Sequence, residues 1–183
     1  ALDDVVEGRS VAAVIAIENS IEGGVSVAQD ALAVIPNLRI VGEYLVPVDA
    51  DDLLTPDALA ILASVAASED LPDLVHSDED VLDGDRHRDP FLRPDWDPVL
   101  HLSGSYVWHA LCIKRTTAVD LGLYDDPSFE WCHDWDTVER IRRVGGRIVH
   151  VPEVLYNWRR HAGSSTNTDR PESAQQDSVK AMF

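Results

Sequence analysis

The sequence predicts an α/β fold: a single three-layer αβα domain with a mixed, mostly parallel sheet and helices on both faces. Two observations along the chain support this. Residues 11–48 contain an apolar run, a segment with helical spacing and a second apolar run, and an amphipathic segment at residues 133–144 is followed by two short apolar runs. With 183 residues, 45% of them hydrophobic, the chain is long enough to bury a core.

The first predicted unit is a βαβ half-unit that covers residues 1–48. Val11–Ile17 and Leu38–Val48 are continuous apolar runs, which is typical of strands covered on both faces. Between them, Val25–Val34 has apolar positions at helical spacing. A strand, a helix and a strand in this order predict a parallel pair with a right-handed crossover.

Residues 49–183 are expected to pack onto this half-unit as one domain. Thr55 followed by Pro56 predicts the N-cap and first position of a helix that ends near Ala67. Leu74–His76 is a predicted short strand, and the polar stretch of residues 78–98, which contains several prolines, is a predicted surface loop.

The last predicted elements are three strands and a helix. Tyr106–Ile113 is a predicted strand, and His133–Val144 is a predicted amphipathic helix that ends before two glycines. Arg147–Val151 and Val154–Trp158 are predicted short strands.

Composition limits the classes of partner. There are 15 Lys plus Arg against 33 Asp plus Glu, a net charge of −18, so nucleic acid is not an expected partner. Neither a zinc cluster nor a disulfide framework is indicated by Cys112 and Cys132. Because no secretory signal and no apolar run long enough to span a bilayer are visible, we expect a cytoplasmic protein without a transmembrane segment. An exposed edge of the half-unit would favour a homodimer.

Asp49 and Asp51 follow the predicted strand that ends at Val48. Side chains two residues apart lie on one face of a strand, so these carboxylates can converge where the strand ends. Such a pair suits Mg²⁺ or Mn²⁺ that is also held by phosphate groups of a substrate. Acidic residues that simply end a strand are the alternative.

Two further segments carry candidate chemistry. Asp134 lies at the start of a predicted helix, where it could accept a proton from a hydroxyl or simply cap the helix. Near the end of the chain, His161 could bind a metal ion, and Arg159 with Arg160 could neutralise a diphosphate. A solvated histidine is the alternative for His161.

Taken together, these segments resemble a known enzyme family. Residues 42–166 resemble the family-two glycosyltransferases of the GT-A fold, especially bacterial enzymes of cell-surface polysaccharide synthesis. The matching strings are GEYLVPVDADDLLTPDAL, HSDED, PFLRPDWDP and HDWDTVERIRRVGGRIVHVPEVLYNWRRHAGSS.

This resemblance implies an inverting, metal-dependent transfer of a sugar from a nucleotide-diphosphate sugar to a hydroxyl acceptor. Asp49 and Asp51 would be the DxD metal pair, His161 a further metal ligand and Asp134 the general base. The other residues at matching positions would contact the donor or acceptor: Asp78, Glu79, Trp96, Trp158 and Arg159.

The beginning of the chain departs from this family, because the strings that hold the nucleoside in family-two enzymes are missing. Instead, residues 1–48 resemble a segment of prephenate dehydratase, through VAAVIAIENSIEGGVSVAQDALA and LRIVGEYLVPV. The Thr-Arg-Phe and Glu-Ser-Arg-Pro strings of that family are absent. We infer a chimera joined near residues 42–46.

Three functional interpretations stay open at this point. The first is a glycosyltransferase whose activity is impaired by the missing nucleoside-binding segment. The second is a non-catalytic recombined scaffold, and the third is a ligand-binding remnant of prephenate dehydratase.

Overall fold

The computed structural model describes residues 18–19, 23–24, 43–129 and 132–160. The chain divides into two compact units, Ala1–Val41 and Gly42–Phe183. This boundary lies at the start of the inferred junction at residues 42–46 and seven residues before the predicted end of the half-unit at residue 48. In the first unit, β1 (Glu18–Asn19) pairs with β2 (Gly23–Gly24) in antiparallel fashion. The predicted strand at residues 11–17 and the predicted helix at residues 25–34 lie outside the described residues. Packing of the two units into one domain stays a prediction.

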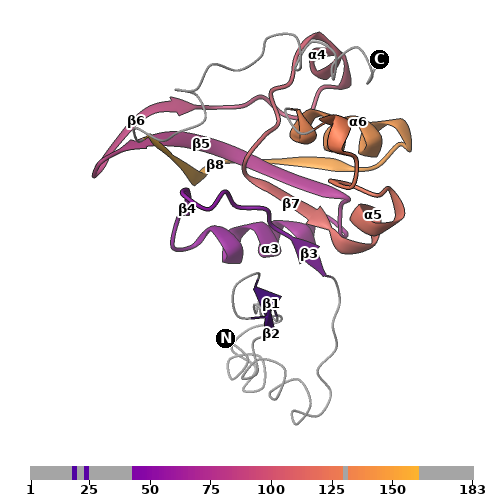
Figure 1. Ribbon diagram of the computed structural model, residues 1–183, viewed down its shortest axis with the longest axis horizontal. Coiled ribbons are helices and arrows are strands. Elements are labelled where there is room, and N and C mark those ends of the chain that lie inside the picture. The colour runs from indigo at the N-terminus through magenta and orange to yellow at the C-terminus, as the bar shows by residue number, and fades with distance from the viewer. Residues whose placement is uncertain (1–17, 20–22, 25–42, 130–131, 161–183) are drawn as a thin grey trace. The chain divides into compact units, whose positions relative to one another are not determined.

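The second unit is built on a six-stranded mixed sheet (Figure 1). Its strand order is β3-β7-β5-β8-β4, and β6 pairs with β5. The strands are β3 (Tyr44–Leu45), β4 (Leu53–Leu54), β5 (Leu74–Asp83), β6 (Arg86–Phe91), β7 (Leu111–Lys114) and β8 (Ile148–Arg160).

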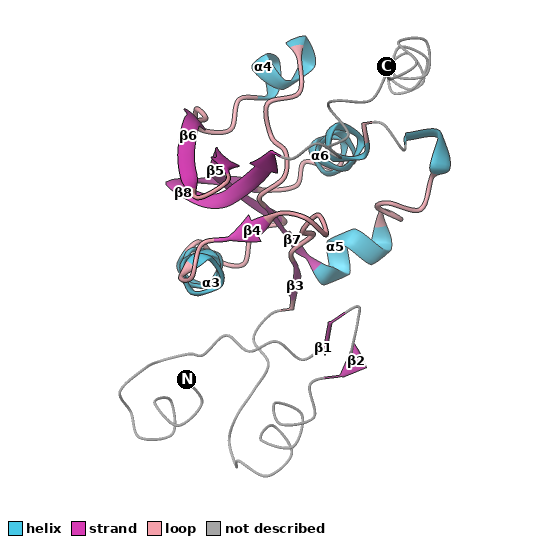
Figure 2. Ribbon diagram, turned by 60° about the vertical axis from the view of Figure 1, so that its left-hand side comes forward, coloured by secondary structure: helices cyan, strands magenta, loops and turns pink. Residues whose placement is uncertain are grey.

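Helices lie on both sides of this sheet, as predicted (Figures 1 and 2). Helix α3 (Ala58–Ser68) lies on one side, and α6 (His133–Arg143) lies on the other. The shorter helices are α4 (Pro98–Ser103), α5 (Arg115–Asp120) and the 3-10 turn η1 (Pro127–Phe129). Among the described helices, none is long and apolar enough to cross a membrane.

The side chains of β7 alternate between the two faces of the sheet and contribute to a hydrophobic cluster on each face. Leu111 and Ile113 pack into the cluster that includes Val138 and Ile141 of α6. Cys112, between them in the sequence, packs into the cluster on the α3 side. Successive side chains of a strand point to opposite faces, so one short strand contributes to both cores.

The mixed α/β fold class is confirmed, but the sheet is mostly antiparallel and not mostly parallel as predicted. Among the described strands, β5 and β8 form the parallel pair, and the other pairings of the sheet are antiparallel. One of the four antiparallel pairings comes from a hairpin: residues 78–98, predicted as a surface loop, include the rest of β5, a turn at Gly84 and β6. Strands joined by so short a turn must be antiparallel.

Other predicted elements are found with shifted bounds. The helix predicted from Pro56 begins at Ala58, with Asp57 at the N-cap position. The two strands predicted at residues 147–151 and 154–158 form the single strand β8. Its pairing with β5 shifts between Val151 and Val154, so the predicted break at Pro152 is an irregularity within one strand.

Candidate functional site

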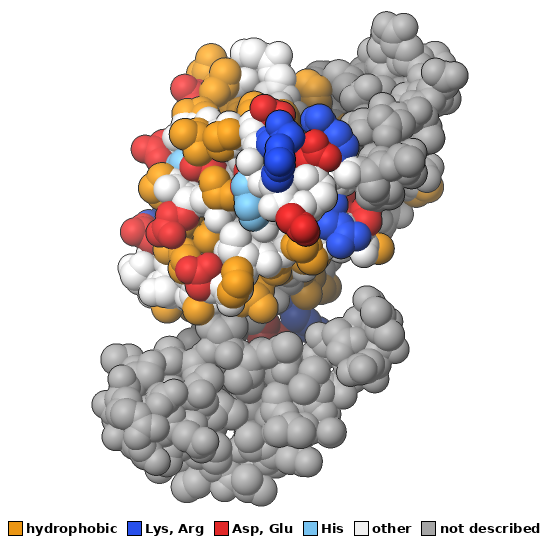
Figure 3. Space-filling model, turned by 90° about the vertical axis from the view of Figure 1, so that its left-hand side faces the viewer, with side chains coloured by type: hydrophobic (Ala, Val, Ile, Leu, Met, Phe, Trp, Pro, Cys, Tyr) orange, Lys and Arg blue, Asp and Glu red, His pale blue; other side chains and the backbone are white. Residues whose placement is uncertain are grey.

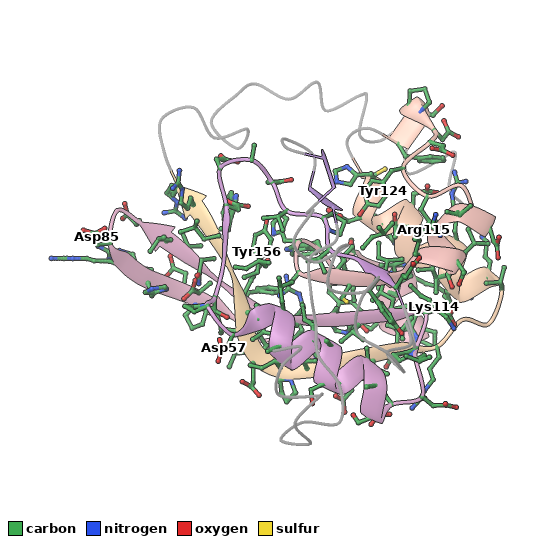
Figure 4. All side chains as sticks on the ribbon, turned by 90° about the horizontal axis from the view of Figure 1, so that it is seen from below. Asp57, Asp85, Lys114, Arg115, Tyr124 and Tyr156 are labelled. Carbon is green, nitrogen blue, oxygen red and sulfur yellow. The ribbon has the colours of Figure 1, made fainter. Side chains whose placement is uncertain are left out.

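The acidic loop between β3 and β4 is anchored to β8 through Asp52. The buried carboxylate of Asp52 accepts hydrogen bonds from the hydroxyl of Tyr156, at 2.7 Å, and from the backbone N–H of Arg159, at 2.7 Å. The Tyr156 hydroxyl also accepts the backbone N–H of Asp49, at 3.2 Å. Figure 4 shows Tyr156 among the strands of the sheet. Sequence reasoning assigned Asp52 no site role, yet this residue fixes the loop that carries Asp49 and Asp51.

The two predicted metal ligands in this loop differ in exposure, since Asp49 is exposed and Asp51 is half-buried. His161, the third predicted ligand, lies outside the described residues. Within the part of the chain that the structure describes, no group of three His, Cys, Asp or Glu side chains is arranged to hold a metal ion. Carboxylate oxygens nevertheless suit a hard divalent cation as ligands. The remaining ligands of such a cation would come from phosphate groups and water.

Asp134, the predicted base, lies in the first turn of α6 with 24% of its side chain exposed. Burial raises the pKa of this carboxyl group. The positive charges of His133 and His109 oppose that increase, whereas the negative charges of Asp49 and Glu79 add to it. The structure therefore brings the predicted base into electrostatic range of one predicted metal ligand and one predicted substrate residue.

Glu79 on β5 connects three side chains. Its carboxylate lies 2.8 Å from Nδ1 of His109 and 3.1 Å from a guanidinium nitrogen of Arg93, and it accepts the indole N–H of Trp108 at 3.1 Å. Burial alone would raise the pKa of Glu79, but the hydrogen bond from His109 and the charges of His109 and Arg93 lower it. Glu79 is thus an ionised buried group with partners on both oxygens.

His109 was missed by the sequence analysis, although its charge acts on the pKa of the predicted base. Its ring stacks on Tyr156 at 5.5 Å and on Trp158 at 6.2 Å between centroids. Burial would lower the pKa of His109, but the hydrogen bond and charge of Glu79 outweigh it and raise the value. The only sequence signal was an isolated histidine within the predicted strand at residues 106–113, and this signal does not reveal Glu79, 30 residues earlier.

The remaining predicted substrate residues have different surroundings. Asp78 is buried, and one of its oxygens accepts the backbone N–H of Arg93 at 2.9 Å and lies 2.8 Å from Nε2 of His150. Trp96 packs partly buried against the α6-side core and stacks on Tyr106. These contacts favour structural roles for Asp78 and Trp96. Trp158 lies beside His109, and the side chain of Arg159 is exposed.

A solved structure has the same type of fold. S. aureus TarS, residues 1–349 in complex with UDP-GlcNAc, matches with a TM-score of 0.58 and 12% identity, over 78% of this chain and 42% of that one. The second unit has a GT-A-type fold. The predicted fold resemblance is therefore confirmed.

Two relatives extend the likeness to sequence. The O-antigen biosynthesis protein RfbC of Myxococcus xanthus is 33% identical over 127 residues, which are 69% of this chain and 10% of the relative. An uncharacterised protein of Sinorhizobium fredii, y4gI, is 33% identical over 132 residues, which are 70% of this chain and 14% of that protein. The chain thus spans a small part of these relatives. Together with the fold, these likenesses support a glycosyltransferase-like scaffold.

The family model of prephenate dehydratase matches residues 1–69. The predicted resemblance of residues 1–48 is confirmed, and the match continues through α3. Two resemblances on one chain are consistent with the inferred chimera.

Proposed function

We propose that the second unit performs a metal-dependent, inverting transfer of a sugar from a nucleotide-diphosphate sugar to a hydroxyl acceptor. The observation that carries this proposal is the setting of Asp134: a mostly buried carboxylate at a helix start, with its pKa raised, in range of Asp49, Glu79 and His109. A raised pKa brings a carboxylate closer to the value that suits a general base.

In the proposed reaction, the acceptor oxygen attacks the anomeric carbon while the bond from that carbon to the diphosphate oxygen breaks. The proton of the acceptor hydroxyl passes to Asp134, and the diphosphate leaves with the bonding electron pair. Asp49 and Asp51, with His161, would hold Mg²⁺ or Mn²⁺, which neutralises charge on the leaving diphosphate. Arg159, whose backbone N–H is bonded to Asp52 of the same loop, would add positive charge.

Asp52 and Tyr156 have a positioning role in this proposal. Their hydrogen bond fixes the loop against β8, so the carboxylates that precede Asp52 are presented from a stable backbone. His109, held by Glu79, would contribute a positive charge that attracts the carboxylates of Asp134 and Asp49. Because the expected nucleoside-binding strings are missing from residues 1–41, we expect turnover to be slow.

The experiment is a thermal shift with Mn²⁺ and uridine diphosphate, since a ligand that binds the native state raises the melting temperature. We expect a rise for the unmodified chain and none for Asp51→Asn. Asp120→Asn is the matched control, because it removes the same charge from an exposed position at the end of α5. No rise for the unmodified chain, or an equal rise in both variants, would contradict the proposal.

The match of residues 1–69 to the prephenate dehydratase model favours one alternative, a ligand-binding remnant of that family. This alternative predicts stabilisation by phenylalanine or phenylpyruvate instead of the nucleotide. A non-catalytic recombined scaffold predicts stabilisation by neither. The same thermal-shift measurement separates all three interpretations.

A further inference from the structure

Two aromatic side chains that the proposed reaction does not use form a stacked pair beside the site. Phe91, the last residue of β6, stacks on Trp108 with ring centroids 5.4 Å apart and 25° between the planes. The Phe91 side chain is 42% exposed, and Trp108 is half-buried. We call Phe91 and Trp108 the aromatic platform. A partly exposed phenylalanine ring at a strand end is open to contact by a ligand.

Arg93 contacts both rings of the aromatic platform with its guanidinium group. Its side chain is completely buried, and its guanidinium carbon lies 4.8 Å from the Phe91 centroid and 5.4 Å from the Trp108 centroid. The same guanidinium group donates to the backbone carbonyls of Ser77, at 3.0 Å, and Tyr106, at 2.8 Å. A cation fixed by several hydrogen bonds keeps both rings in one orientation.

Glu79 fixes the indole edge of the platform. It accepts the indole N–H of Trp108 on one oxygen and contacts His109 with the other. The charges of Glu79 and His109 both act on the pKa of Asp134. Glu79 therefore bonds the platform directly and acts on the predicted base through its charge alone.

We propose that the aromatic platform binds a pyranose ring of a saccharide acceptor. This inference rests on the proposed function and specifies its acceptor class. The carbon-bound hydrogens of a pyranose form an apolar face, and their slight positive charge is attracted to the negative face of an aromatic ring. A rigid platform loses little conformational freedom when the sugar binds.

Exposed polar side chains of both charges precede Phe91 on the same strand. Arg86, Arg88 and Asp89 are exposed on β6, and Arg88 pairs with Asp83 across the hairpin. Figure 3 shows hydrophobic, acidic and basic side chains on the face that it presents. Side chains of these kinds donate hydrogen bonds to sugar hydroxyls and accept hydrogen bonds from them.

The test is saturation-transfer NMR with neutral oligosaccharides of glucose and N-acetylglucosamine, at about millimolar concentrations where weak binding is measured. We expect transfer to the carbon-bound protons of a pyranose ring. Phe91→Ala should weaken this binding by about 3- to 10-fold, the value of one aromatic contact. The matched control is Leu92→Ala, which truncates the next residue, 68% exposed, and should leave binding unchanged.

Three results would overturn the inference: no transfer to any saccharide, equal loss in Phe91→Ala and Leu92→Ala, or no loss in Phe91→Ala. The thermal shift with Mn²⁺ and uridine diphosphate is measured on the same variants and should be retained in both. A retained nucleotide shift without saccharide binding contradicts only the platform. Saccharide binding without a nucleotide shift contradicts only the proposed transfer reaction.

Discussion

The carboxyl group of Asp134 lies where a catalytic base is proposed, and its ionised form lowers the stability of the folded chain. Burial raises its pKa, so the folded chain binds this proton more tightly than the unfolded chain does. The ionised form therefore lowers the free energy of unfolding once the pH is above the folded-state pKa. Groups that lower stability in this way are common at functional sites.

Asp134→Asn should separate these two effects. We expect transfer to fall by about 100- to 10,000-fold, because the proton acceptor is lost. At neutral pH the variant should have a higher melting temperature than the unmodified chain, since the neutral amide avoids the cost of a buried charge. This gain should shrink as the pH falls below the raised pKa. Lower stability of the variant at neutral pH would contradict the assignment.

His76 on β5 is a second residue whose burial has a measurable consequence. It is completely buried and stacks on His150 at 4.8 Å, and within the described residues neither ring nitrogen has a hydrogen-bond partner. Burial, followed by the charges of His150 and Arg93, lowers its pKa from 6.5 to about 3. The unfolded chain therefore takes up a proton below pH 6.5 that the folded chain does not bind.

His76→Phe should make the free energy of unfolding less dependent on pH. The unmodified chain loses stability as the pH falls from 6.5 toward 3, by at most about 1.4 kcal/mol per pH unit from this group. Phe keeps the ring contact and cannot titrate, so this contribution should disappear. Urea unfolding at about pH 7 and pH 5 measures it. An unchanged pH dependence would contradict the assignment, and substitution of the exposed His87 is the control.

At the scale of elements, the end of α6 depends on a close contact at Gly146. A Cβ atom there would lie 2.6 Å from Cγ2 of Ile141 and 3.0 Å from its carbonyl oxygen. Ile141 is completely buried in the α6-side core, so it cannot move without loss of packing. This contact fixes the path from α6 into β8.

Gly146→Ala should lower the free energy of unfolding by about 1–3 kcal/mol, the usual cost of overpacking. Gly104→Ala is the control, because a Cβ atom there meets nothing within 4 Å and the backbone is extended, with φ of 171°. Chemical denaturation of both variants measures the difference. Equal effects would show that the contact with Ile141 is unimportant.

The elements also show what pattern alone can predict. The amphipathic helix at residues 133–144 was found within one residue of its end, because its polar and apolar faces follow the helical period. The β5–β6 hairpin was missed, since Ser77–Asp80 are polar and yet buried by pairing on both edges of β5. The partnership of Glu79 with His109 joins residues 30 positions apart and has no local signal.

For the whole molecule, the division into two units has a direct consequence. Residues 42–183 contain the sheet, both hydrophobic clusters and the candidate site among the described residues. We expect these residues, produced alone, to unfold cooperatively and to keep the thermal shift with Mn²⁺ and uridine diphosphate. Loss of the cooperative transition would show that residues 1–41 complete the core.

The most direct test of the proposed reaction is a crystal structure of the chain with Mn²⁺ and uridine diphosphate. The metal ion should lie against the carboxylates of Asp49 and Asp51, at about 2.0–2.3 Å from an oxygen, and the diphosphate should lie on the same side of the sheet as Asp134. A nucleotide bound away from the loop at residues 49–52, or a metal ion without either carboxylate, would contradict sugar transfer at this site.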